Sequence, residues 1–130
     1  MNTINVNDLV ENNLKKGNDL FAQTKYREAI ECFENALLCS PNRLQEIESQ
    51  FKKGRCFVKL RKRKEAIESY DQVLSVDPEN LSALNFKGFT LSELKAEWDA
   101  KKVFDLANQL NSNPNNTEKI LNKGLSLNGL

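Results

Sequence analysis

A pattern of small and aromatic residues recurs three times along this chain and restricts its fold more than any other feature. Glycine, alanine and an aromatic residue follow at matching offsets in each copy: Gly17, Ala29 and Phe33; Gly54, Ala66 and Tyr70; Gly88, Ala100 and Phe104. The second and third glycines are 34 residues apart, and the first and second are 37 apart. A period near 34 residues, with small and aromatic residues at fixed offsets, is the signature of a helix–turn–helix repeat.

Apolar residues within each copy recur at three- and four-residue spacing, which predicts helices with one buried side. The third helix is expected at 43–60 and the fourth at 64–76, and Trp98 is expected in the apolar stripe of the sixth. Asn7 and Asp8 are expected to cap the first helix, and Asn80 the fifth, because their side-chain oxygens accept from free backbone N–H groups.

The recurring glycines are expected to bring paired helices close together. A missing side chain lets the partner helix approach, so each glycine is expected to face the alanine of its own second helix. Ala66 would then lie at the contact between two paired helices, whereas Ser69 is expected on the outer face.

In these recurring positions the chain resembles tetratricopeptide repeat (TPR) proteins, over most of its length. The resemblance implies an all-α fold, a right-handed superhelical array of antiparallel helix pairs with about seven helices. It implies a single domain over 1–130, with repeats at about 10–46, 47–80 and 81–114. A capping helix is expected at about 117–128, and the alternative is the start of a fourth repeat.

Composition and charge exclude several classes of protein. The net charge is +1, so no overall field favours nucleic acid or membrane. The longest apolar run is four residues, 36–39, which is too short to span a bilayer. The first eight residues lack the basic and apolar regions of a secretory signal, so a cytoplasmic location is expected, with a nuclear one left open.

The residue types needed for catalysis are largely missing. There is no histidine, which is the commonest general base. Cys32, Cys39 and Cys56 have no Cys-x-x-Cys spacing, and the glycines are not clustered into a phosphate-binding loop. The sequence therefore predicts no enzyme, no cofactor, no metal and no small-molecule substrate.

In TPR proteins the first helix of each repeat lines a concave groove, and the resemblance places eight ligand-contacting positions there. They are Lys15, Asn18, Phe21, Lys52, Arg55, Lys59, Phe86 and Phe89. Leu14 and Phe51 are assigned to the core, while Phe86 and Phe89 are left between core and groove. The cations predict an acidic anchor on the ligand, and the phenylalanines predict an apolar one.

One TPR subfamily holds the carboxylate tails of cytosolic heat-shock chaperones with lysine, asparagine, asparagine, lysine and arginine. The matching positions here are Leu14, Asn18, Lys52, Ser82 and Phe86, of which only Asn18 agrees. Lys15 is one position from a match, which is about 100° of rotation on a helix. The resemblance is therefore to a TPR module without the dicarboxylate clamp.

Five of the six residues from Lys59 to Lys64 are basic, and they fall between two expected helices. They are interpreted as a solvated turn, with a nuclear import signal or a contact with RNA or an anionic surface as the alternatives. No aromatic residue interrupts the run, so nucleic-acid bases have no stacking platform there.

The sequence predicts a non-catalytic adaptor that holds a peptide or helix of a partner protein. Two alternatives remain open at this point. One is binding of nucleic acid or an anionic surface through residues 59–64, and the other is self-association through the last helix.

Overall fold

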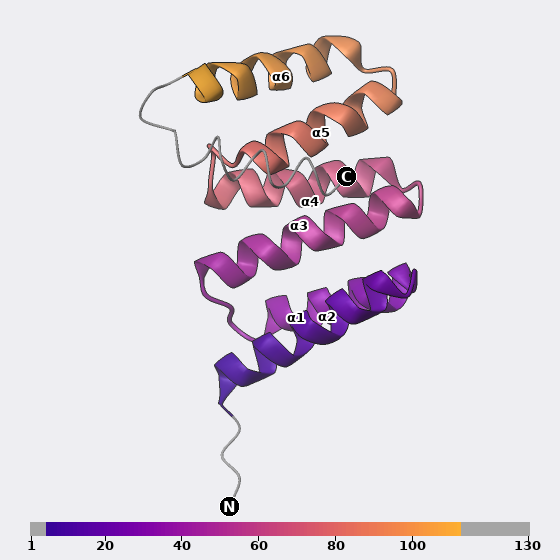
Figure 1. The fold of residues 1–130 in the computed structure, drawn as a ribbon, viewed down its shortest axis with the longest axis vertical. Coiled ribbons are helices and arrows are strands. Elements are labelled where there is room, and N and C mark those ends of the chain that lie inside the picture. Colours follow the sequence, from indigo (N-terminus) through magenta and orange to yellow (C-terminus); the bar gives the residue numbers. More distant parts are fainter. Residues whose placement is uncertain (1–4, 113–130) are drawn as a thin grey trace, which may run out of the picture.

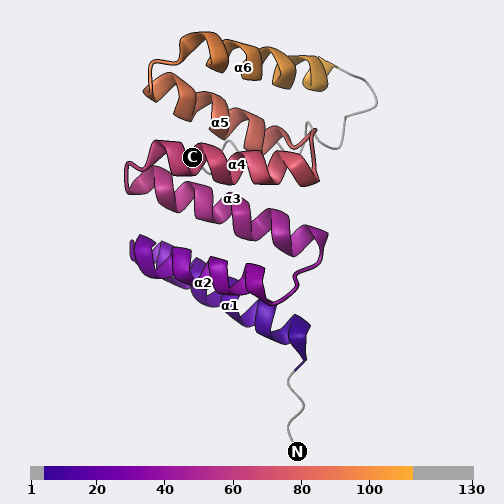
Figure 2. The same ribbon diagram turned by 180° about the vertical axis from the view of Figure 1, so that it is seen from behind.

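The computed structural model describes residues 5–112, which form six α-helices. These are α1 (Val6–Ala22), α2 (Tyr26–Leu38), α3 (Arg43–Lys59), α4 (Arg63–Val76), α5 (Leu81–Glu93) and α6 (Glu97–Ser112). Helix α1 pairs with α2, α3 with α4 and α5 with α6, and each pair packs on the next. Figures 1 and 2 show the helices following one another along the long axis. The predicted all-α array of antiparallel pairs is confirmed, and the expected helix at 117–128 lies outside the described residues.

The recurring residues of the sequence occupy equivalent buried places in the three pairs. The alanines of the second helices, Ala29, Ala66 and Ala100, are at most 3% exposed. One turn later, Phe33 and Tyr70 are completely buried, and Phe104 is half-buried. The repeat in the sequence therefore corresponds to a repeat in the packing, because each pair has small residues where its two helices meet.

Each recurring glycine lies nearest the aromatic ring of its partner helix, and not nearest the alanine as the sequence predicted. A Cβ added to Gly54 would lie 2.6 Å from Cε1 of Tyr70. The other two pairs repeat this arrangement, with 2.6 Å from Gly17 to Phe33 and 2.5 Å from Gly88 to Phe104. The ring stands one turn beyond the alanine and reaches across to the bare backbone. Glycine suits these positions because a Cβ would force the ring to shift.

The turn inside each pair has one residue with a left-handed backbone: Thr24, Arg61 and Lys95, with φ of 62°, 60° and 60°. In the middle pair the backbone N–H of Lys62 donates to the carbonyl of Phe57 at 2.8 Å, and that of Arg61 donates to Val58 at 3.0 Å. This is the Schellman arrangement, which satisfies the last carbonyls of the helix.

An asparagine side chain caps the N-terminus of the first helix in each pair. Asn80 Oδ1 accepts from the backbone N–H of Ala83 at 2.9 Å, so the predicted cap of α5 is confirmed. Helix α1 is capped by Asn5, whose Oδ1 accepts from Asn7 at 2.9 Å, so the expected cap at Asn7 and Asp8 was two or three residues late. Each cap satisfies a backbone donor that would otherwise lack a partner.

Gln45 links the first two pairs through polar contacts. Its backbone N–H donates to Asn42 Oδ1 at 2.8 Å, and its Oε1 accepts from the Asn42 backbone at 2.9 Å, which completes a capping box. Its Nε2 donates to Asn7 Oδ1 at 2.8 Å and to Glu11 Oε1 at 2.7 Å. Helix α3 is therefore held to α1 by a side chain that is only 7% exposed.

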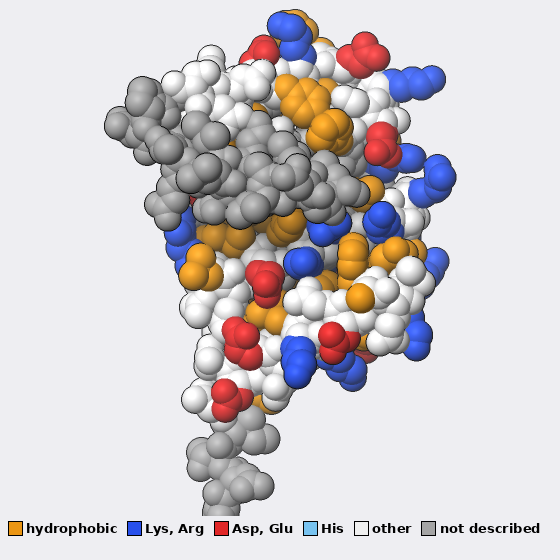
Figure 3. Space-filling view, in the orientation of Figure 1, with side chains coloured by type: hydrophobic (Ala, Val, Ile, Leu, Met, Phe, Trp, Pro, Cys, Tyr) orange, Lys and Arg blue, Asp and Glu red, His pale blue; other side chains and the backbone are white. Residues whose placement is uncertain are grey.

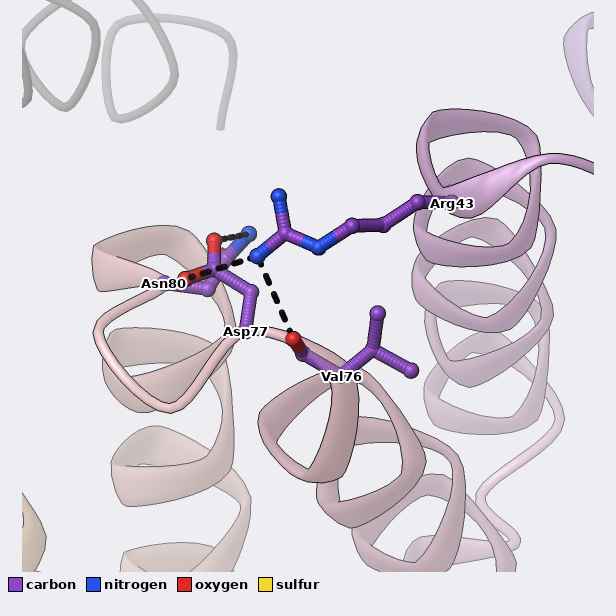
Figure 4. A network of polar contacts seen from close by, with 4 residues as sticks. All are labelled: Arg43, Val76, Asp77 and Asn80. Carbon is purple, nitrogen blue, oxygen red and sulfur yellow. Dashed lines mark hydrogen bonds and ion pairs between the residues drawn. The ribbon is translucent and has the colours of Figure 1, made fainter.

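A second polar contact joins the start of α3 to the turn between α4 and α5 (Figure 4). The guanidinium of Arg43 donates to the Val76 carbonyl at 3.2 Å and lies 3.9 Å from an oxygen of Asp77. Asn80 Nδ2 donates to the other Asp77 oxygen at 3.3 Å. The Arg43 side chain is 63% exposed, so the contact orients the turn more than it stabilises the fold.

Two residues differ from their expected environment. Ser69 is 3% exposed rather than on the outer face, and its hydroxyl donates to the Glu65 carbonyl at 3.2 Å. It is buried because α4 is covered on more than one side in a stacked array. Trp98 is 70% exposed rather than part of the apolar stripe of α6, and the Lys102 ammonium lies 5.3 Å from its ring centroid.

Candidate functional site

Helices α1, α3 and α5 lie on one face of the array, which we call the first-helix face. Helix α1 stands in front of α2 in Figure 1 and behind it in Figure 2. Figure 3 looks onto this face and shows Lys and Arg side chains beside hydrophobic ones, with several acidic side chains at the lower left, toward the start of α1, and others at the top and upper right. The face therefore combines positive charge with accessible apolar surface.

Arg55 lies at the centre of the first-helix face, between two aromatic rings from the neighbouring pairs. Its guanidinium carbon is 5.1 Å from the centroid of Phe21 on α1 and 5.5 Å from that of Phe86 on α5. A guanidinium within about 6 Å of a ring centroid is attracted by the electrons of the ring. Three of the sequence-predicted site residues, one from each helix pair, are therefore brought together in a single stack.

A cluster of aromatic rings supports this stack from α3, α4 and α5. The centroids of Phe51 and Phe86 are 5.1 Å apart in an edge-to-face arrangement, and Tyr70 lies 5.8 Å from Phe51 and 6.0 Å from Phe86. Phe51 and Phe86 are both half-buried. Such pairs add to the energy of burial and fix the orientation of each ring. Leu14 is 3% exposed, as the sequence predicted for a core residue.

Phe89 belongs to both core and surface. Its ring meets Phe104 edge to face at 5.4 Å, yet the residue is 49% exposed. One side of the ring is packed while the rest faces solvent. An aromatic residue held in this way presents apolar surface at little cost in side-chain entropy.

A hollow of about 250 Å³ opens between α3, α4 and α5. Its lining residues are Arg55, Val58, Lys59, Tyr70, Phe86, Phe89, Thr90 and Glu93. Four of the eight predicted site residues therefore share one depression. The three predicted residues of α1, Lys15, Asn18 and Phe21, do not line it, and neither does Lys52 of α3.

The remaining predicted cations are accessible and have no acidic partner in the part of the chain that the structure describes. Lys15 and Lys59 are exposed and Lys52 is half-buried. Among residues 5–112, no ion pair involves these lysines or Arg55. Glu93, the acid in the hollow, is held by Arg63, with 2.7 Å between Arg63 Nε and a Glu93 oxygen.

Tyr70 is the site residue that sequence reasoning missed, because its spacing assigned it to the core alone. It is 0% exposed, and its hydroxyl oxygen has no hydrogen-bond partner within the described part of the chain. Burial raises the pKa of this hydroxyl well above its usual range, although the nearby Arg55 acts in the opposite direction. The group therefore stays protonated and remains a donor. Its one signal in the sequence is a tyrosine where the other two pairs have phenylalanine.

The recurring pattern of this fold also matches a known family in sequence. A family model described as tetratricopeptide repeat matches residues 9–79, more than half of the chain. The chain belongs to the tetratricopeptide repeat family. Such TPR helix pairs form protein–protein interaction modules that are typically non-catalytic. No curated protein matches the chain in sequence.

Solved TPR structures share the fold at low sequence identity. The second TPR of Spaghetti (RPAP3), bound to an HSP90 peptide, has a TM-score of 0.69 at 21% identity and covers 77% of this chain and 90% of that one. The C-terminal TPR-containing domain of a putative FK506-binding protein from Plasmodium falciparum has 0.73 at 23% identity, over 94% and 88%. The Hsp90 co-chaperone Cns1 from Saccharomyces cerevisiae has 0.75 at 22% identity, over 88% of this chain and 36% of Cns1.

Two of the TPR clamp positions have packing roles in this chain. Leu14, at the position of the first clamp lysine, is buried in the core of the first pair. Phe86, at the clamp arginine position, belongs to the aromatic cluster around Tyr70. Asn18 agrees with the clamp, is half-buried, and its Oδ1 has no hydrogen-bond partner among residues 5–112.

The basic run 59–64 forms the turn between α3 and α4 of the TPR array. Arg61 is its left-handed residue, and Arg63 is the ion-pair partner of Glu93. Two of the five cations therefore have structural roles, while Lys59, Lys62 and Lys64 are exposed.

Two further features of the described TPR helices bear on function. None of α1–α6 is both long enough and apolar enough to cross a membrane. Between residues 5 and 112 there is no group of three cysteine or acidic side chains positioned to hold a metal ion. The three cysteines are free thiols, with Cys32 and Cys56 buried and Cys39 half-buried.

Proposed function

We propose that the first-helix face of this TPR domain binds a short segment of a partner protein, in an extended or helical form, that carries one acidic and one apolar anchor. The observation that carries the proposal is Arg55, which is held between Phe21 and Phe86 yet has no acidic partner among residues 5–112. A guanidinium fixed in this way keeps its N–H groups for a carboxylate and loses little side-chain entropy on binding.

The apolar anchor is assigned to the surface around Phe89. Phe89 is 49% exposed and lines the hollow together with Val58 and Phe86. Buried aromatic side chains tend to supply most of the energy of such interfaces, whereas charges mainly set orientation and association rate. We infer a non-catalytic adaptor in which the phenylalanines give affinity and the cations select an acidic ligand.

The distribution of charge on the face gives the ligand a preferred position. Glu11 and Glu48 lie in the earlier turns of α1 and α3, and Lys15, Lys52 and Lys59 lie in the later turns. An acidic segment is attracted to the later turns and repelled from the earlier ones. The ligand is therefore expected near the hollow rather than across the whole face.

The experiment begins with a phage library of random twelve-residue peptides, selected on the full chain. Binding of the strongest peptide is then measured by calorimetry on Phe89→Ala and Arg55→Glu. Phe89→Ala is expected to weaken it by about 2 kcal/mol or more, mainly through faster dissociation. Arg55→Glu is expected to weaken it by an amount that shrinks as salt is added.

Two matched variants control for changes away from the face. Trp98→Ala removes an exposed aromatic from α6, and Arg27→Glu makes the same charge change on α2. Both are expected to bind like the wild type, and all four variants must keep its melting temperature. Full-strength binding by Phe89→Ala and Arg55→Glu would move the site to another face.

A peptide of the HSP90 type separates this ligand from the clamp-binding TPR domains. Only Asn18 of the clamp positions is retained, so the peptide SRMEEVD is expected not to saturate the domain. Saturable micromolar binding that Asn18→Ala abolishes would contradict the proposed site.

A further inference from the structure

We propose that the hydroxyl of Tyr70 is a specificity-determining donor, which hydrogen-bonds a carboxylate oxygen of the acidic anchor inside the hollow between α3, α4 and α5. The inference rests on the peptide-binding function proposed above and identifies the group that recognises the acid. It separates the role of the hollow from that of the exposed lysines, which attract the ligand without fixing its position.

The hydroxyl is not needed for packing. The rings of Phe33, Tyr70 and Phe104 occupy equivalent places, each against a glycine of the partner helix. Phenylalanine fills this place in two of the three pairs, so the contact with glycine is made by the ring alone. Only the middle pair, which lies under the hollow, carries a hydroxyl there.

The hydroxyl is unsatisfied within the described protein. Tyr70 is 0% exposed, and its oxygen is buried without a hydrogen-bond partner among residues 5–112. An unpaired polar group of this kind costs free energy in the folded chain, and pairing with a ligand would recover it. A protonated phenol donates one hydrogen bond, so the missing partner is an acceptor.

The surroundings select a negatively charged acceptor. Arg55 and Lys59 line the same hollow and have no acidic partner among the described residues, whereas Glu93 is already held by Arg63. A carboxylate there would accept from Tyr70 with one oxygen and from Arg55 with the other. Hydrogen bonds with an ionised partner are stronger than neutral ones, and more so out of water.

Entry of a ligand requires a rearrangement of side chains. Because Tyr70 has no exposed surface, the long side chains of Lys59 and Glu93, which line the hollow, must turn to admit the ligand, while Arg55 stays between its two rings. Changes of rotamer of this kind are common when interfaces form. A rim of phenylalanine then encloses the carboxylate, so the fitting ligand has an aspartate or glutamate next to an apolar residue.

The test compares two peptides on two tyrosine variants of the full chain. The strongest acid-containing peptide from the library is made in a second version, in which the acid is replaced by its amide. Tyr70→Phe removes only the hydroxyl, and Tyr26→Phe, at the other tyrosine, is the matched control. Calorimetry gives the dissociation constants of both peptides for wild type and variants.

Tyr70→Phe is expected to weaken the acidic peptide by roughly tenfold to a hundredfold, as for a lost hydrogen bond to a charged group. The amide peptide is expected to lose less than about twofold, because its weaker acceptor gains little from the hydroxyl. Tyr26→Phe is expected to change neither peptide. The melting temperature of Tyr70→Phe should equal or exceed that of the wild type, since an unsatisfied buried group is removed.

Equal losses for the two peptides, or no loss for either, would overturn the role of Tyr70 and leave the proposed function standing. A library that yields only peptides without acidic residues would overturn the role of Tyr70 and also the acidic anchor of the proposed function. A chain that selects no peptide would overturn both proposals. A dimer seen by sedimentation and dissolved by Phe89→Ala would assign the hollow to a second copy of the chain and also overturn the inference.

Discussion

Gly54 lies so close to the ring of Tyr70 that a Cβ on the glycine would be 2.6 Å from Cε1 of the ring. The contact sets the spacing between α3 and α4, and it also fixes the ring whose hydroxyl lies beneath the hollow. Packing and the proposed recognition of an acid therefore depend on the same pair of residues.

Gly54→Ala is expected to destabilise the domain, although alanine favours helices. Overpacking costs about 1–3 kcal/mol, and the gain in helix propensity returns about 1 kcal/mol. Gly88→Ala is the comparison, because its ring, Phe104, is half-buried and has room to move. Urea unfolding should show the larger loss for Gly54→Ala, and a variant as stable as the wild type would disprove the packing role of the glycine.

Ala66→Leu is expected to lower the free energy of unfolding by about 1–3 kcal/mol through overpacking. Ala66 has no exposed surface, whereas Ser75 on the same helix is exposed. Ser75→Leu is therefore the control and should change stability by less than about 0.5 kcal/mol. Ser69 is unsuitable for this purpose because it is buried. Similar losses for Ala66→Leu and Ser75→Leu would argue against the assigned helix contact.

Thr24→Gly is expected to stabilise the chain by about 0.5–1 kcal/mol, since a β-branched residue with φ of 62° is strained. The adjacent Gln23 has φ of −86°, so Gln23→Gly relieves no strain and should destabilise the chain. Thermal melts of the two variants should shift in opposite directions. A lower melting temperature for Thr24→Gly would show that the left-handed turn is not retained in solution.

Stability is expected to fall in alkaline solution because of Cys56. Burial raises the pKa of its thiol from 9.0 to about 12. The unfolded chain loses this proton first, so the contribution of the thiol is complete below about pH 9 and is lost as pH rises toward about 12. The drop in urea midpoint between pH 8 and about pH 10 should be smaller for Cys56→Ala than for the wild type. Equal drops would show that the thiol is not buried as described.

The sequence predicted the helices and their pairing well because each helix buries its stripe against a neighbour at a fixed offset. The period of 34 residues identified the small residues at the contacts, and α3 was expected at 43–60 and is found at Arg43–Lys59. What the pattern could not show is which atom fills the space left by a glycine. The aromatic ring fills it, because it is the longer side chain one turn beyond the alanine.

The candidate site was predicted in part. Offsets within the repeats placed Arg55, Phe86 and Phe89 on one face, and they line one hollow. The contact of Arg55 with two rings depends on side-chain directions across three helices, which spacing alone does not give. Tyr70 was missed because a buried aromatic at helical spacing usually indicates core, and only its unpaired hydroxyl distinguishes it.

The most direct test of the account is a map of amide chemical-shift changes when the strongest selected peptide is added to the labelled full chain. We expect the largest changes to cluster around Arg55, Tyr70 and Phe89, with little change near Arg27 on α2. Changes concentrated on α2 and α4, away from the residues of the hollow, would contradict binding at the first-helix face.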